Sequence, residues 1–130
     1  MELGEPSWWQ DALVQLNQDE LLGPIVKRYP EGGLSGKGNV FSTIIRAIVG
    51  QQISVLAADA VWGRLEAFVG RIDPDSISKK TPEELATCGL TRSKASYIHG
   101  LASDAERLLT FEWSESSDKE IHAHLTSFRG

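Results

Sequence analysis

Cysteine is almost absent from this sequence: Cys88 is the only one among 130 residues. A single cysteine excludes an intrachain disulfide and a metal site built from several cysteines, so we expect Cys88 to be a small buried side chain in a reducing cytosol. Apolar runs of about 18 residues, long enough to cross a bilayer, are also missing. The first ten residues, MELGEPSWWQ, lack the basic and hydrophobic regions of a signal peptide. The sequence therefore predicts a cytoplasmic protein with no membrane partner.

The chain is acidic overall, but its acidic residues are missing from two stretches. The formal net charge is −5, from 13 Lys and Arg against 18 Asp and Glu, and this balance argues against nucleic acid as a partner. No Asp or Glu occurs in residues 32–58, or in residues 85–103, where Arg92 and Lys94 lie. An acidic protein can still present a neutral or basic face to an anion, although chance clustering explains the same pattern.

Apolar residues recur at helical spacing, and no segment alternates like a strand between hairpin turns. We therefore predict an all-α fold with about seven helices, in a single domain of residues 1–130 that is complete or part of a larger one. Capping residues, glycines and prolines suggest where each helix begins and ends. The expected helices begin after Ser7, cover 20–28, and run from Asn39 to Gly50, Ser54 to Gly70, Thr81 to Gly89, Thr91 to Leu109 and Ser117 to Gly130. Residues 71–81 are expected to form a turn-rich connection.

Three of these helices carry apolar stripes that predict a buried face. The stripes are Phe41, Ile44, Ile45, Ile48 and Val49; Leu56, Ala57, Ala60, Val61, Leu65 and Phe68; and Ala95, Ile98, Leu101, Ala102, Ala105 and Leu108. Together they are sufficient for one helical core.

Residues able to carry catalysis or hold a metal are sparse. His122 and His124 are two apart and point to different faces of a helix, whereas helical zinc pairs need a spacing of about four. His99 stands alone, and capping and the helix dipole explain the carboxylates in the first turns of helices. The loop GGLSGKGN lacks the register of a phosphate-binding loop. The residues alone therefore predict no catalytic residue, no metal and no cofactor.

Two basic residues open the helix expected after Thr91. Arg92 and Lys94 lie in its first turn, where free backbone N–H groups could also hold a DNA phosphate. A capped helix with two solvated basic residues is the simpler interpretation. Both interpretations stay open at this point.

The stretch RAIVGQQIS places two glutamines, Gln51 and Gln52, at the break between two apolar helices. One interpretation is that they satisfy open carbonyl groups at the helix end. A glutamine at an exposed corner is also long, flat and neutral, so it can enter a base stack without the desolvation cost of a charge. An enzyme that extrudes a base needs such a side chain to fill the hole.

Three stretches together resemble the helix-hairpin-helix DNA glycosylase superfamily: FSTIIRAIVGQQIS, TPEELATCGLTRSKASYIHGLA and HLTSFRG. The resemblance runs from about Trp8 to Gly130 and points to the DNA-3-methyladenine glycosylase II branch. RAIVGQQIS is fairly specific to that branch, whereas GLTRSKASYI is shared across the superfamily. The resemblance implies an all-α fold and the removal of alkylated purines from double-stranded DNA in a bacterial cytoplasm, by cleavage of the N-glycosidic bond.

The same resemblance implies roles for individual residues. Members flip the damaged base and fill the gap with a side chain from the loop after the RAIVG-type helix. The matching position here is Gln52, with Gln51 beside it and Ser54 as the cap that fixes the shape of the corner. Gly130 matches the first glycine of a hairpin whose backbone amides hold a DNA phosphate.

The family's catalytic aspartate lies beyond the position that matches Gly130, so the resemblance carries over no catalytic residue. It implies the N-terminal part of a glycosylase that is inactive by itself and exposes an apolar patch. Self-association or a complementing C-terminal fragment is then the expected protein partner. A different class stays open, namely a non-catalytic helical module that binds DNA or a protein.

Overall fold

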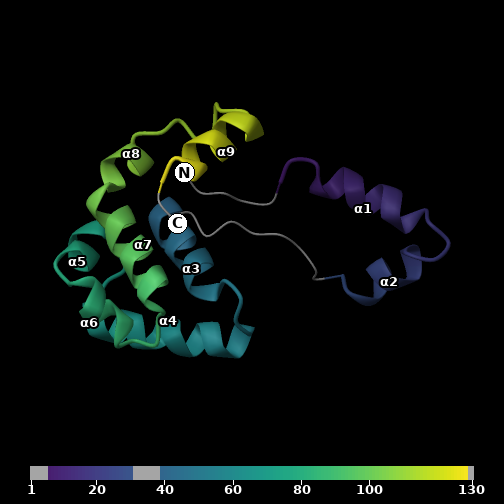
Figure 1. Ribbon diagram of the computed structural model, residues 1–130. Helices are drawn as coiled ribbons and strands as arrows, with labels where there is room; N and C mark the ends of the chain where they lie inside the picture. The colour runs from purple at the N-terminus through teal and green to yellow at the C-terminus, as the bar shows by residue number, and fades with distance from the viewer. Residues whose placement is uncertain (1–5, 31–38, 129–130) are drawn as a thin grey trace. The chain divides into compact units, whose positions relative to one another are not determined.

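The computed structural model describes residues 6–30 and 39–128, and its regular structure there is entirely helical (Figure 1). The helices within these ranges are α1 (Trp9–Asn17), α2 (Gly23–Arg28), α3 (Val40–Gly50), α4 (Val55–Val69), α5 (Pro74–Ser78), α6 (Pro82–Ala86), α7 (Arg92–Ser103), α8 (Ala105–Leu109) and α9 (Asp118–Thr126). The all-α prediction is confirmed. The chain divides into two compact units, Met1–Asn39 and Val40–Gly130. The single domain remains a prediction, and each unit is described by itself.

Ser7 does not cap α1, contrary to the prediction. The N-cap position is Trp8, whose side chain makes no capping hydrogen bond. The chain enters the helix through a turn in which the Trp9 amide donates to the Pro6 carbonyl at 2.9 Å. Because this turn moves the start of the helix along the chain, the Ser7 hydroxyl lies outside the capping position.

The second helix, α2, begins at Gly23 rather than at the predicted Glu20. Asp19 explains the difference, because its carboxylate accepts from the amides of Leu21 at 2.8 Å and Leu22 at 2.9 Å and holds them in a turn. The Leu22 and Leu21 amides also hold the pKa of Asp19 below its usual value. The end of α2 agrees with the prediction.

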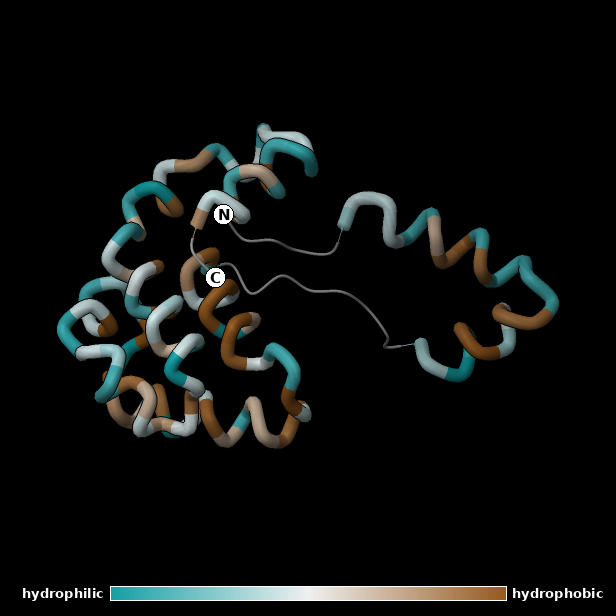
Figure 2. The backbone as a smooth tube through the Cα atoms, viewed as in Figure 1, coloured by the Kyte–Doolittle hydropathy of each residue, from teal (hydrophilic) through white to brown (hydrophobic). Residues whose placement is uncertain are grey.

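In the larger unit, α3 supplies the start of the core. Phe41, Ile45 and Val49 are buried as predicted, whereas Ile44 and Ile48 are half-buried and pack against the edge of the core. Figure 2 shows the concentration of hydrophobic residues along α3. The predicted stripe is therefore divided into a core face and a partly open flank.

Only two of the six residues predicted to form the buried stripe of α4 are buried. Val61 and Leu65 are buried, and Ala58, which was not predicted, is buried with them. The spacing of these three residues describes one narrow stripe of a helix, so neighbouring apolar positions face outward. The predicted residues that stay exposed are Leu56, Ala57, Ala60 and Phe68. Gly70, with φ of +81°, ends α4 as predicted.

The connection after α4 contains a short helix, α5, that was not predicted. The Asp73 carboxylate caps it by accepting from the Ser76 amide at 2.7 Å, and Pro74 takes the first helical position. The Ser76 amide also lowers the pKa of Asp73. The sequence Asp-Pro contains this signal, because aspartate favours the N-cap and proline the position after it.

The predicted capping box of α6 is confirmed: the Thr81 hydroxyl accepts from the Glu84 amide, and the Glu84 carboxylate accepts from the Thr81 amide. The helix ends at Ala86, however, before the predicted Gly89. Gly89 has φ of +101° and turns the chain toward α7. Between them Cys88 is buried as predicted, and burial raises the pKa of its thiol.

The helix predicted from Thr91 to Leu109 is interrupted at Asp104, where φ is −108° and ψ is 20°. The two resulting helices, α7 and α8, keep the predicted buried face. Its buried members are Ala95, Ile98, Leu101, Ala102, Ala105 and Leu108. The last helix, α9, opens with the predicted capping box at Ser117 but ends at Thr126 rather than Gly130.

Candidate nucleic-acid interface

Residues Gln51–Ser54 connect α3 to α4 and are called the corner below. Gln51, Gln52 and Ile53 are exposed there. Gln52 has φ of +60° and, within the described ranges, is the only residue other than glycine with a positive φ. A side chain with a Cβ disfavours this left-handed conformation, so the surrounding structure must hold it.

Ser54 fixes the exit from the corner. Its Oγ accepts from the Ala57 amide at 3.1 Å and caps α4, which confirms the predicted cap. Three apolar side chains surround this cap, with exposed fractions of 41% for Ile53, 76% for Val55 and 82% for Leu56. The corner therefore presents amide and apolar side chains to solvent, and no charged ones.

Lys94 fixes the entry to the corner. Its Nζ donates to the carbonyl oxygens of Val49 at 3.1 Å and Gln51 at 2.6 Å. The structure thus brings together two residues predicted for the site, Gln51 of the corner and Lys94 of α7, which are distant in the sequence. Thr91 caps α7 by accepting from the Lys94 amide at 3.1 Å, which places the lysine in the first turn as expected.

Arg46 joins α3 to α4 behind the corner, and the sequence reading missed it. Its guanidinium forms an ion pair with Asp59 of α4 and lies 5.2 Å from the centre of the Trp62 ring. The sequence contains a signal for this ion pair, namely the spacing of the two residues. Arg46 precedes the corner by about as many residues as Asp59 follows it, so the two face each other where the helices meet.

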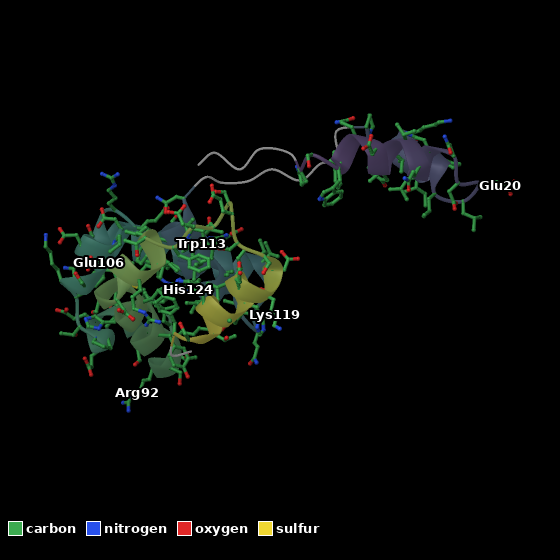
Figure 3. All side chains as sticks on the ribbon, turned by 90° about the horizontal axis from the view of Figure 1, so that it is seen from above. Glu20, Arg92, Glu106, Trp113, Lys119 and His124 are labelled. Atoms are coloured by element: carbon green, nitrogen blue, oxygen red, sulfur yellow. The ribbon has the colours of Figure 1, made fainter. Side chains whose placement is uncertain are left out.

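Arg92 is separate from these contacts. It is the first residue of α7, is exposed, and extends into solvent (Figure 3). It makes no ion pair with any described residue. Arg92 and Lys94 therefore differ, because the guanidinium is open to an anion while the ammonium already has two acceptors. Gly130, the remaining predicted DNA contact, lies outside the described residues.

An apolar groove of about 250 Å³ opens beside the corner. Its lining comes from α3, α7 and the end of α9, and it reaches Gln51. The lining residues are Ile44, Ala47, Ile48, Gln51, Tyr97, Leu101, Leu125 and Phe128. This groove contains the partly open flank of α3.

His124 of α9 belongs to an aromatic cluster, whereas His122 is exposed. The His124 ring stacks on Phe111 with centroids 4.0 Å apart and meets the Trp113 ring edge-on at 5.7 Å (Figure 3). Across residues 6–30 and 39–128, no group of three or more His, Cys, Asp or Glu side chains could hold a metal ion. Within the same ranges no helix has both the length and the apolar character to span a bilayer.

Comparison with known proteins identifies the class. Residues 45–124 match the model of a family described as HhH-GPD superfamily base excision DNA repair protein. This match covers more than half of the chain, and the chain belongs to this family. The resemblance of the corner and α6–α7 motifs to the helix-hairpin-helix superfamily is thereby confirmed. No curated protein sequence matches the chain.

Two solved structures are similar over nearly the whole chain. The DNA-3-methyladenine glycosidase of Bacillus halodurans is 26% identical with a TM-score of 0.65, and the match covers 91% of this chain and 57% of that one. The 3-methyladenine DNA-glycosylase of Archaeoglobus fulgidus is 27% identical with a TM-score of 0.72, and the match covers 93% and 46%. The chain therefore spans about half the length of these solved relatives.

Proposed function

We propose that this chain binds double-stranded DNA and probes its base stack with the corner, as part of an alkylated-purine DNA glycosylase. The observation that carries the proposal is the exposed Gln52, held in a left-handed conformation at the tip of a braced corner. Membership of the base-excision repair family supplies the context.

The chemistry of the corner suits insertion into DNA. The Gln52 amide can hydrogen-bond to base edges, and its flat shape can occupy the space left by a flipped base. Proteins that enter the minor groove often use apolar side chains to separate base steps. Ile53 and Leu56 stand exposed beside Gln52 and suit this task. The absence of charge at the corner avoids a desolvation cost on entering the stack.

Arg92 is proposed to contact a DNA phosphate, and it offers a direct test of duplex binding. We expect weak binding, because the chain is acidic overall. The binding should also be sensitive to salt, because each phosphate contact releases counterions from the DNA. Arg92→Gln should weaken binding equally for all sequences and reduce the slope of log K against log salt by about 0.9, the value for one phosphate contact. Fluorescence titration of a labelled duplex at several salt concentrations measures both quantities.

Arg71→Gln provides the matched control for this titration. Arg71 is also exposed, but it follows the far end of α4. A helix of 15 residues spans about 22 Å, so Arg71 lies well away from the corner. Arg71→Gln is expected to leave duplex binding unchanged. If Arg92→Gln leaves it unchanged as well, a module that binds another protein becomes the better interpretation.

The substrate is proposed to be an alkylated purine, since both solved relatives are named for 3-methyladenine. We further propose that the apolar groove is covered by polypeptide equivalent to the part of these relatives outside the match. The 130 residues alone are then expected to release no methylated purine, because none of their aspartates is assigned to catalysis.

Chromatography of bases released from methylated duplex DNA tests this expectation. The purified chain should give no release above a protein-free blank, and release should appear when the equivalent segment of a relative is added. Release by the 130 residues alone would contradict the proposal. Sedimentation of the chain without added segment shows whether a second copy covers the groove instead.

A further inference from the structure

Lys94 stands out among the basic residues because its ammonium is already engaged. Two of its three N–H donors go to the Val49 and Gln51 carbonyls. Both carbonyls lie at the C-terminal end of α3, where helix carbonyls lack partners and a positive charge is favoured. The side chain is half-buried, unlike that of Arg92. These features indicate a structural task at the corner rather than a contact with a phosphate.

We propose that Lys94 is a positioning residue that holds the corner in its left-handed shape and so keeps Gln52 directed outward. A single peptide group links the Lys94 contact to Gln52. The Gln51 carbonyl and the Gln52 amide belong to one planar peptide, so the bond from Nζ to the Gln51 oxygen at 2.6 Å fixes the orientation of that peptide. The orientation of the peptide, in turn, sets φ of Gln52.

The second acceptor strengthens this assignment. A single bond to Gln51 would let the peptide pivot, whereas the additional bond to Val49 at 3.1 Å ties the ammonium to the body of α3. A compact ammonium on a flexible stem can reach two carbonyls at once, which the planar fork of an arginine matches less well. Lys94 thereby connects the first turn of α7 to the residue before the tip of the corner.

The ion pair between Arg46 and Asp59 does not hold the peptide between Gln51 and Gln52. It joins α3 to α4 behind the corner and touches neither the Gln51 carbonyl nor the Gln52 amide. Without Lys94 the ion pair would still join α3 to α4. The peptide between Gln51 and Gln52 could rotate, however, and Gln52 could then leave the left-handed region that a Cβ disfavours. The expected defect is therefore local to the corner.

The first test uses the free protein and needs no DNA. The Gln51 amide donates to the Ile48 carbonyl at 3.3 Å, so its exchange reports opening of the corner. In Lys94→Met, which keeps the length and loses the ammonium, we expect this exchange to become about tenfold faster, because the bonds that hold the Gln51 peptide are lost. The Gln52 backbone chemical shifts should move away from the left-handed range. Lys119→Met, at an exposed lysine of α9, is the control and should change neither. Lys94→Gln is a second neutral variant in case the methionine variant does not fold.

The second test uses a duplex carrying 2-aminopurine, whose fluorescence reports unstacking, and it rests on the proposed function. Lys94→Met should remove the unstacking signal while leaving the salt slope of binding unchanged. A slope lower by about 0.9, with Gln52 still left-handed in the free protein, would instead make Lys94 a phosphate ligand and overturn the proposal. Unchanged exchange and shifts at the corner would overturn it as well. If the unsubstituted chain binds no duplex, the proposed function fails, and the free-protein test still decides the role of Lys94.

Discussion

Replacing Leu65 with alanine is expected to lower the free energy of unfolding by about 3 kcal/mol, within the range measured for buried leucines. Leu65 lies in the second half of α4 and is 0% exposed within the larger unit. Its truncation leaves a cavity in the closely packed core, which the surrounding side chains cannot readily fill. A loss of this size is a large part of the total stability of a small domain.

Leu56→Ala is the matched control, because it makes the same chemical change in the same helix. Leu56 is 82% exposed, so its truncation should change the free energy of unfolding by less than about 0.5 kcal/mol. Urea denaturation of the three proteins, followed by circular dichroism, compares the two substitutions directly. Equal losses for both leucines would contradict the packing of α4 described above.

The two leucines also show how far helical spacing predicts a core. Both belong to the apolar stripe read from the sequence, and only Leu65 is buried. Spacing identifies the helix and its general apolar side, but the width of the buried stripe depends on which helices cover it. In α7 and α8 the covered face coincides with the whole stripe, so every predicted residue there is buried.

Four predicted side-chain caps at helix starts are present in the structure, whereas the Asp73 cap of α5 was not predicted. Ser54, Thr81, Thr91 and Ser117 all accept from the backbone amide that their sequence context indicates. Ser7 failed because a backbone turn around Pro6 competes with its hydroxyl. A side-chain cap depends on residues within four positions of one another, so the sequence predicts it. A neighbouring turn can still move the start of the helix to another residue.

In the candidate site, likewise, features set by neighbouring residues can be predicted from the sequence, whereas contacts between distant helices cannot. Gln51 and Gln52 stand out in the sequence, since amides at the break between two apolar helices are visible in RAIVGQQIS. The bonds from Lys94 to Val49 and Gln51 are not visible there, because they depend on how α7 packs against α3. Spacing places Lys94 in the first turn of a helix, and only the fold places its ammonium against the corner.

The most direct consequence for function concerns Gln52, whose truncation should remove selectivity for a gap in the base stack. A duplex with an abasic position offers the hole that a gap-filling side chain occupies. We expect Gln52→Ala to reduce the preference for this duplex over an intact one by about tenfold, equivalent to about 1.4 kcal/mol. Binding to the intact duplex should be nearly unchanged, because phosphate contacts dominate it.

Gln51→Ala is the control, with the same residue type one position earlier. Its backbone carbonyl, which accepts from Lys94, is retained in alanine, so the shape of the corner should survive. The preference for the abasic duplex should then change by less than about threefold, under 0.7 kcal/mol. Competition titrations with the two duplexes measure the preference for each variant. A larger loss for Gln51→Ala than for Gln52→Ala would assign the gap-filling role to Gln51, since the left-handed backbone at Gln52 would then serve only to turn the chain into α4.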